Sequence, residues 1–387
     1  MAKKVLIFSL AYGPRFWGGA EIAVKEITDR IAPENVSFDM ITLRFDATLP
    51  REEKMGNIFV HRVGFSAKNP DVKDLSSFPL LANKYLFPLL AFLKAVSLYR
   101  KNHYDATWAI MANYAGFAAL FFKLAYPKIF YLLTLQEGDP ISYIKRRVRL
   151  VYPLFRHIFT KADAVQAISH YLAAFGAEMG AREPVCVIPN GVDTALFREK
   201  TEKYFPGLNE GPKTLITTSR LVQKNAIEDI IEALTFLPSD VRLLVLGIGP
   251  LERELKEKAE LFGVKERVFF LGHKPHAEMV RYLEDAHIFV RPSLSEGMGN
   301  SFIEAFAAGL PVIATPVGGI PDFLRHEETG LFCEVKNPRS IAQQAARLFV
   351  DRMLREKIIA NARRLARTRY NWDTITREFE EKIFRMV

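Results

Sequence analysis

Residues 291–319 read RPSLSEGMGNSFIEAFAAGLPVIATPVGG, and they predict a glycine loop, a helix and a strand in that order. The apolar run at 286–290 before them predicts another strand, and the run at 310–314 predicts the strand that follows the helix. Residues 300–308 have their apolar side chains at helical spacing. A strand, a crossover helix and a second strand build a parallel sheet, so we predict an α/β fold.

The loop of this stretch has the properties of an anion site. Gly297 and Gly299 lie just before the predicted helix, which directs unpaired backbone N–H groups and its positive end toward the loop. Glycines also let an anion approach the backbone closely. Glu296 and Glu304 place two carboxylates beside this site, although a glutamate pair alone would mean little in a chain with 44 acidic residues.

Composition indicates a globular protein with an anionic partner. The chain has 387 residues, of which 49% are hydrophobic and 25% charged, and this length favours two domains. Its net charge of +9 is compatible with nucleic acid, an anionic membrane surface or nucleotide phosphates. Nucleic acid ranks last, because the sequence has no zinc-finger, KH or RNP-type pattern.

Alternating strands and helices extend along the whole chain and predict doubly wound sheets. We expect a first domain over 1–197, a linker over 198–213, a second domain over 214–368 and a last helix over 369–387 that returns to the first domain. Further strands are expected at 5–10, 37–43, 58–63, 106–111, 129–133, 164–168, 185–188, 241–246 and 267–272, and another begins at 214.

Two segments of the first domain have the composition of a membrane-contacting surface. Residues 78–99 are apolar, and residues 143–157 are basic and aromatic. Either they lie on anionic lipid, or they pack on the sheet and present a basic face to solvent. The two cysteines, Cys186 and Cys333, lie in apolar stretches and are expected to be buried and unpaired. We therefore expect a cytoplasmic protein, at the inner face of the membrane if these segments touch lipid.

The first strand leads into Gly18 and Gly19, which precede a helix that should end near residue 31. A Gly-Gly pair at this place suits close approach by a phosphate, and it is equally compatible with a plain turn. The full G-x-G-x-x-G spacing of a dinucleotide site is absent.

Five segments in order resemble the retaining glycosyltransferases of the GT-B fold, in the large family 4 that carries the E-x7-E motif. They are Gly18-Gly19, PNGVD at 189–193, Ser219-Arg220-Leu221, LGIGP at 246–250 and the stretch 291–319. The resemblance covers essentially the whole chain. It implies two Rossmann-like domains facing across a cleft, with a nucleotide-sugar donor held mainly by the second and an acceptor held mainly by the first.

The resemblance also assigns roles to residues. It implies that Glu304 binds the donor ribose, that Glu296 meets the donor sugar hydroxyls, and that Arg220 binds the diphosphate. Glu296, Arg220 and Lys224 are the candidate catalytic residues. The full predicted donor set is Gly18, Gly19, Arg220, Lys224, Gly249, Gly272, Glu296, Gly297, Met298, Gly299, Asn300, Ser301 and Glu304.

Three departures from the family pattern affect these roles. The family lysine usually stands five residues after the arginine, where this chain has Asn225, with Lys224 one residue earlier. Either the loop is shifted and Lys224 serves, which we favour, or the second cation is missing. Met298 replaces the usual aromatic residue of the loop.

The third departure lies on the acceptor side. Gln136 stands where a histidine is frequent, and it cannot carry protons. Glu137 and Asp139 are the candidate substitutes for contact with the acceptor or donor sugar, unless these residues only turn the chain.

The implied activity is transfer of a hexose-type sugar from a UDP- or GDP-sugar to a hydroxyl of a glycan, a lipid-linked saccharide or another acceptor, with retained configuration. No metal or other cofactor is expected, because the chain lacks an Asp-x-Asp motif and its cations and helix end can neutralise the leaving diphosphate. The alternatives are a GT-B epimerase or phosphorylase, and a non-catalytic protein that binds nucleotides or a membrane surface.

Overall fold

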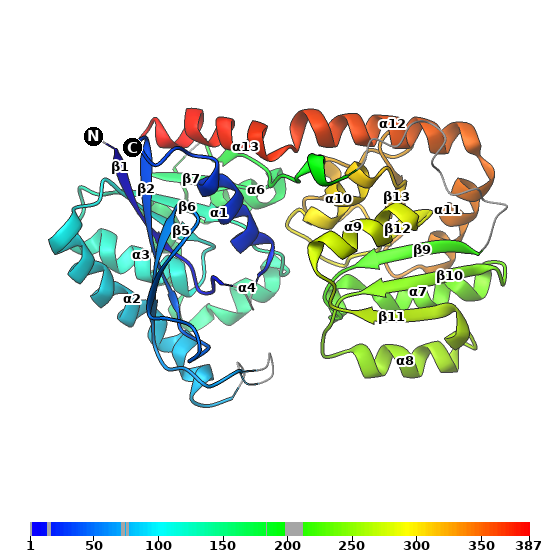
Figure 1. Cartoon of the computed structure of the whole chain (residues 1–387), viewed down its shortest axis with the longest axis horizontal. Coiled ribbons are helices and arrows are strands. Elements are labelled where there is room, and N and C mark those ends of the chain that lie inside the picture. The colour runs from blue at the N-terminus through cyan, green and yellow to red at the C-terminus, as the bar shows by residue number, and fades with distance from the viewer. Residues whose placement is uncertain (1, 14–16, 71–73, 75–76, 183, 198–211) are drawn as a thin grey trace. The chain divides into compact units, whose positions relative to one another are not determined.

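A computed structural model describes residues 2–13, 17–70, 74, 77–182, 184–197 and 212–387. The chain divides into two compact units (Figure 1). The first contains Met1–Asn190 together with Trp372–Val387, and the second contains Gly191–Asn371. Each unit is an α/β domain with its own sheet.

The sheet of the first unit has eight strands among the described residues, in the order β3-β4-β2-β1-β5-β6-β7-β8. All neighbouring pairs are parallel except β3 and β4. The chain reverses its direction of travel across the sheet between β1 and β5, which is the arrangement of a doubly wound fold. The strands are β1 Lys3–Phe8, β2 Val36–Leu43, β3 Glu52–Met55, β4 Ile58–Val63, β5 Ala106–Ile110, β6 Phe130–Leu135, β7 Ala164–Ala167 and β8 Cys186–Val187.

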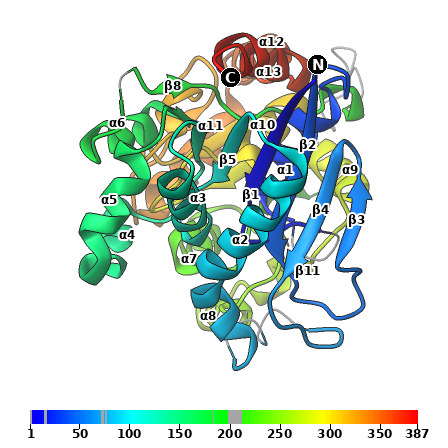
Figure 2. The ribbon, with the colours of Figure 1, turned by 90° about the vertical axis from the view of Figure 1, so that its left-hand side faces the viewer.

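Helices bury both faces of this sheet, which explains why its central strands are almost continuously apolar. The side chains of β5 are all buried, and Trp108 of this strand is among the largest of the fully buried side chains. Helices α2 and α3 pack side by side (Figure 2). The helices are α1 Gly19–Asp29, α2 Leu80–Asn102, α3 Tyr114–Ala125, α4 Ile141–Arg147, α5 Tyr152–Thr160 and α6 His170–Glu178.

The last segment of the chain belongs to the core of the first unit. Helix α13, Trp372–Phe379, buries Trp372, Ile375 and Phe379 in the same cluster as β1 and β5. The ring of Phe379 lies 5.0 Å from that of Trp108. The α-helix continues as a π-helix over Glu380–Phe384.

The second unit contains a parallel sheet of six strands among the described residues, in the order β11-β10-β9-β12-β13-β14. Here the direction of travel reverses between β9 and β12. The strands are β9 Lys213–Thr218, β10 Val241–Leu246, β11 Val268–Gly272, β12 Ile288–Arg291, β13 Val312–Ala314 and β14 Leu331–Phe332. The helices are α7 Ile227–Ala233, α8 Glu252–Leu261, α9 His276–Asp285, α10 Asn300–Ala308, α11 Pro338–Val350 and α12 Arg352–Arg369.

The boundaries of the units differ from the predicted domain limits. Residues 191–197 lie in the second unit rather than the first, because Val192 donates to the Tyr370 carbonyl (2.7 Å) and pairs with Asn371 as an isolated bridge. The predicted linker lies almost entirely outside the described residues, and its last residue, Lys213, already begins β9. Helix α13 starts at Trp372, three residues after the predicted 369.

Two details of the sequence prediction were wrong. Strand β3 was not predicted, because Glu52–Met55 is charged and only half-buried at the edge of the sheet, where it needs no apolar face. Cys333 is buried as expected, whereas Cys186 is partly exposed on the opposite edge strand, β8. Both cysteines are unpaired.

Candidate functional site

The carboxyl ends of β9 and β12 meet at the point where the second sheet reverses direction. In open α/β sheets, ligands bind in the crevice outside such a point. Arg220 follows β9, and Glu296 lies in the loop that follows β12. The fold therefore brings the two predicted segments to neighbouring strand ends, although 76 positions separate Arg220 from Glu296 in the sequence.

The loop after β12 is held in shape by glycines at two places. Gly299 has φ +86° and directly precedes α10, whose bounds, Asn300–Ala308, confirm the predicted helix. Gly318 has φ +58°, and a Cβ there would lie 1.9 Å from the Glu296 carbonyl oxygen. Gly319 donates from its backbone N–H to the same oxygen at 3.1 Å. The Gly-Gly pair at 318–319 thus fixes the backbone at Glu296 by close contact.

The Glu296 carboxylate is buried and charge-paired. Its side chain is only 9% exposed, and its Oε2 forms an ion pair with Nη2 of Arg291. Its Oε1 accepts a hydrogen bond from the Gly297 N–H at 3.2 Å. Both carboxylate oxygens of Glu296 thus have a partner within the protein, and a contact of this group with a sugar stays a prediction.

Arg291 connects several parts of this site, and the sequence prediction did not single it out. Its Nη1 donates to the Ser301 hydroxyl at 2.7 Å, and its Nη2 donates to the Asn225 side-chain oxygen at 3.2 Å. Its guanidinium carbon lies 5.3 Å from the centre of the Phe302 ring. The only available signal was a charged residue at the end of an otherwise apolar strand.

Asn225 has a structural role next to Arg220. Asn225 is 2% exposed, and its Nδ2 donates to the Arg220 carbonyl at 2.7 Å. The next residue, Ala226, has φ +48° and precedes α7. Lys224 is half-buried and its carbonyl accepts from Leu294 at 2.7 Å, whereas the Arg220 side chain is exposed. The role of Lys224 toward a diphosphate stays a prediction.

Gly249 has a structural reason that the sequence did not reveal. A Cβ at this position would lie 2.4 Å from the Leu221 carbonyl oxygen, so the loop after β10 can approach the Arg220 loop only with glycine there. Gly272 differs, since it has φ +69° and open space around its Cβ position. Donor binding by either glycine stays a prediction.

Glu304 lies in the second turn of α10, and its side chain is 17% exposed. Its Oε1 lies 3.1 Å from Nε2 of His276, the first residue of α9. His276 was not predicted as a site residue, and its exposed side chain contacts this carboxylate. Met298 is buried, with its side chain in the protein interior. The glycine loop and the first turn of α10 thus contain backbone N–H groups, the Glu296 carboxylate and the polar side chains of Asn300 and Ser301.

The predicted residues of the first unit lie at the carboxyl ends of its strands. Gly18 and Gly19 are exposed at the start of α1, where the Gly18 N–H donates to the Glu21 carboxylate at 2.9 Å. This contact caps the helix, and a Cβ on Gly18 would lie 2.7 Å from the same carboxylate. A phosphate contact by the Gly-Gly pair stays a prediction.

Gln136 and Glu137 follow β6 and are both buried, whereas Asp139 is exposed. The Gln136 side-chain oxygen accepts from Asn190 at 3.2 Å, and Glu137 Oε1 accepts from the Ala112 N–H at 2.6 Å. Burial raises the pKa of Glu137 to about 7, against the lowering effect of that N–H group. The structure thus places Gln136 and Glu137 just past the carboxyl end of β6, and their contact with a sugar stays a prediction.

The described residues were also compared with the usual arrangement of metal ligands. Within the described ranges, no group of three or more His, Cys, Asp and Glu side chains has the arrangement of metal ligands.

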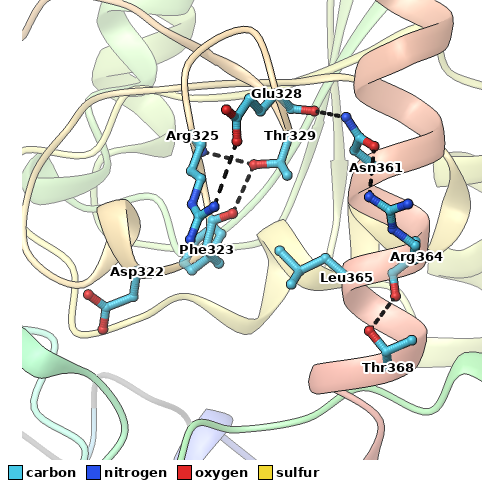
Figure 3. Close-up of a pocket in the computed structure, with 9 residues that line it drawn as sticks. All are labelled: Asp322, Phe323, Arg325, Glu328, Thr329, Asn361, Arg364, Leu365 and Thr368. Atoms are coloured by element: carbon cyan, nitrogen blue, oxygen red, sulfur yellow. Dashed lines mark hydrogen bonds and ion pairs between the residues drawn. The ribbon is translucent and has the colours of Figure 1, made fainter.

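A pocket of the second unit lies between the segment around Arg325 and helix α12 (Figure 3). Its charges are partnered, Arg325 with Glu328 and Arg364 with Asn361, and none of the residues around it is a predicted site residue.

Two family models match the chain in succession. The model described as Glycosyltransferase Family 4 matches residues 17–196, and the one described as Glycosyl transferases group 1 matches residues 199–365. The chain belongs to glycosyltransferase family 4. The predicted family is confirmed, and the two parallel-sheet α/β domains confirm the GT-B fold class.

Three known proteins illustrate how this family 4 glycosyltransferase relates to others. It is 25% identical to the uncharacterized glycosyltransferase MJ1607 of Methanocaldococcus jannaschii, over 97% of this chain and 96% of that one. It is 30% identical to the GDP-mannose-dependent alpha-(1-6)-phosphatidylinositol monomannoside mannosyltransferase of Mycobacterium tuberculosis, over 57% of this chain and 62% of that one. The sucrose-phosphate synthase of Thermosynechococcus elongatus superposes with a TM-score of 0.83 at 21% identity, covering 99% and 98% of the two chains.

Proposed function

We propose that this family 4 glycosyltransferase moves a hexose-type sugar from a UDP- or GDP-sugar to a hydroxyl of a glycan or lipid-linked acceptor, with retention of configuration and without a metal. The observation that carries this proposal is the position of Glu296 and Glu304 around α10, at the point where the second sheet reverses. An anionic donor fits there because the N-terminus of α10 and Arg220 both favour negative charge.

The donor would be bound by complementary groups of the second unit. The Arg220 guanidinium and the first N–H groups of α10 would meet the diphosphate. Glu304 would accept from the two ribose hydroxyls, replacing its contact with His276. Glu296, whose Oε2 is already held by Arg291, would use Oε1 to orient the sugar hydroxyls.

The proposed reaction exchanges one C–O bond for another at the anomeric carbon. The bond to the diphosphate oxygen breaks, and the acceptor oxygen bonds to the same face of the sugar. The acceptor proton passes to the departing phosphate oxygen, so that no protein base is required. The cations and the helix end offset the charge that develops on the leaving group, which lowers the barrier.

On the acceptor side, we propose that Gln136 and Glu137 of the first unit contact sugar hydroxyls. A carboxyl group with a pKa of about 7 is present in both forms near neutral pH, so it can donate or accept a hydrogen bond. Asp139 is the exposed neighbour and completes the predicted set.

A melting screen tests the donor proposal. The protein would be heated with UDP, GDP, ADP and their sugar conjugates, first with a chelator and then with Mg²⁺. A true donor at 100 times its Kd should stabilise the protein by about 2.7 kcal/mol in either condition, and Glu304→Ala should lose most of that shift. Absence of any shift across the panel would refute the proposal. The anomeric configuration of the product, measured by NMR, separately decides retention.

We further propose that the first unit contacts an anionic membrane, at the cytoplasmic face. Helix α2 buries Phe87, Ala91 and Ala95 against the unit, yet its outer face is also apolar. Leu81, Tyr85, Leu89 and Leu93, four residues apart, form an exposed stripe along that face. By length and composition alone, α2 could also cross a membrane, and it is the one such helix in the described ranges.

Basic residues lie next to this stripe. Burial lowers the pKa of Lys84 of α2, and the positive charge of Arg147 in α4 lowers it further. Arg146 and Arg147 lie over the Tyr143 ring, and Leu150 just beyond them is almost fully exposed. An apolar stripe flanked by arginines is complementary to an anionic lipid surface, because the leucines can enter the acyl region while the cations meet the headgroups.

Sedimentation with vesicles tests the membrane proposal. The protein should bind vesicles of phosphatidylcholine with 30–50% phosphatidylglycerol, roughly the charge density at which a basic patch is attracted, and not phosphatidylcholine alone. Leu89→Glu with Leu93→Glu should abolish this binding, whereas Leu261→Glu, at an exposed leucine of the second unit, should not. Equal binding by both variants, or a wild-type dimer that the double variant dissociates, would refute the lipid assignment.

A further inference from the structure

The Arg291 guanidinium is held by three separate segments of the second unit. Its side chain is 11% exposed. It contacts Asn225 from the segment after β9, Glu296 from the loop after β12 and Ser301 from the first turn of α10. A buried guanidinium with this many fixed partners is oriented tightly, because its donors form a rigid planar fork.

The position of this charge is electrostatically unusual. The hydroxyl that accepts from Arg291 belongs to the second residue of α10, so the guanidinium lies at the positive end of that helix. A cation is disfavoured there by the helix dipole. Glu296 is the one carboxylate paired with Arg291 among the described residues, and it faces both the guanidinium and the helix end. The local charge therefore favours a further anion at this place.

Asn225 links Arg291 to Arg220, one of the two predicted cations. Its Oδ1 accepts from Arg291 while its Nδ2 donates to the Arg220 carbonyl at 2.7 Å. One amide thus connects the Arg220 backbone to the group that fixes Glu296. A lysine at position 225 would place an ammonium group beside the Arg291 guanidinium, where two positive charges repel each other.

We propose that Arg291 is a positioning residue, which presents Glu296 and the Arg220 loop to the donor as one unit and adds a positive charge to that of Arg220 at the diphosphate site. This inference rests on the proposed function, because it concerns the same donor site.

Calorimetric titration with UDP and GDP, and with the corresponding nucleosides, tests this role. Arg291→Met should weaken binding of the nucleoside diphosphate that the wild type prefers by about 10- to 100-fold, as expected for lost contacts around a charged group, and should change nucleoside binding little. Arg291→Lys should lie between the two, because it keeps the charge and loses the fork. Arg355→Met removes a buried arginine of α12 that donates to a backbone carbonyl at 2.7 Å, and it should leave nucleotide affinity unchanged.

A charge-relocation variant separates this role from a purely structural one. The double variant Asn225→Lys with Arg291→Met removes the positive charge at the end of β12 and adds one in the segment after β9. Its affinity for the nucleoside diphosphate should recover relative to that of Arg291→Met alone. The inference is overturned if Arg291→Met binds as the wild type does, if it loses nucleoside and diphosphate binding equally, or if the relocated charge gives no recovery. If Arg291→Met does not fold, Arg291→Lys and the double variant decide the result. A wild type that binds no nucleoside diphosphate would refute the proposed function itself.

Discussion

Replacement of Glu137 by glutamine should make the stability of the first unit less dependent on pH. Burial raises the pKa of this carboxyl from 4.5 to about 7, so the folded state disfavours its ionised form. Because the folded pKa lies above the unfolded one, full stability is present below about pH 4.5 and is lost as the pH rises through 7. Glutamine has no such titration and keeps an oxygen that can accept from the Ala112 N–H.

The shift of this pKa sets the expected magnitude. The difference between 4.5 and about 7 corresponds to about 3 kcal/mol of unfolding free energy that the wild type loses at high pH. The stability gained by Glu137→Gln should therefore grow from under about 1 kcal/mol at pH 5 to about 3 kcal/mol at pH 8.5. A gain of this size is large beside the usual effect of a single substitution.

Urea unfolding followed by tryptophan fluorescence measures this gain, since all three tryptophans, Trp17, Trp108 and Trp372, belong to the first unit. Wild type, Glu137→Gln and the control Glu34→Gln, at an exposed glutamate of the same unit, would be compared at pH 5 and pH 8.5. The control should differ little from wild type at both pH values. An equal difference between Glu137→Gln and wild type at the two pH values would refute the reasoning.

Three further predictions concern the second unit. Glu304→Ala should weaken donor binding by about 10- to 100-fold in calorimetry, because a carboxylate that can accept two hydroxyl hydrogen bonds is lost; wild-type affinity would remove Glu304 from the site. Arg220→Ala should slow sugar transfer while its melting temperature stays within the range of a surface substitution, since the side chain is exposed; unchanged transfer rates would contradict its assignment. Gly318→Ala should cost at least about 2 kcal/mol in chemical unfolding, through positive φ and contact with the Glu296 carbonyl, and more than Gly263→Ala, where φ is +69° and the space is open; equal costs would show that the contact is unimportant.

Local patterns in the sequence were sufficient for much of the fold. The bounds of α10, β4 and β10 match the predicted ranges, because periodic burial is written into consecutive residues. Strand β3 escaped prediction because an edge strand with one exposed face needs no apolar pattern. The end of the first unit at Asn190 could not be predicted for another reason. It depends on the hydrogen bond from Val192 to Tyr370, and these residues are far apart in the chain.

The site residues, like the strands, include some that a continuous motif predicts and some whose role depends on contacts between distant segments. Glu296 and Glu304 could be proposed because their motif lies within one continuous stretch. The predicted segments left open what their glycines do: Gly249 of 246–250 and Gly318 of 291–319 are required because a Cβ would lie 2.4 Å and 1.9 Å from a backbone oxygen, whether or not a ligand is bound. A glycine in such a motif can therefore serve the protein backbone, the ligand or both, and only the structure shows the first.

Arg291 and Asn225 show why the remainder needed three dimensions. In the sequence, Asn225 stands where the family lysine is usual and Arg291 is a charge at a strand end, and 66 positions separate them. Their contact exists because β9 and β12 are neighbours, which follows from strand order rather than from any local pattern. Once the strands are adjacent, the side-chain oxygen of Asn225 accepts from the Arg291 guanidinium and helps to orient it. This contact is thus defined by sheet topology, and substitutions at the two positions must be interpreted together.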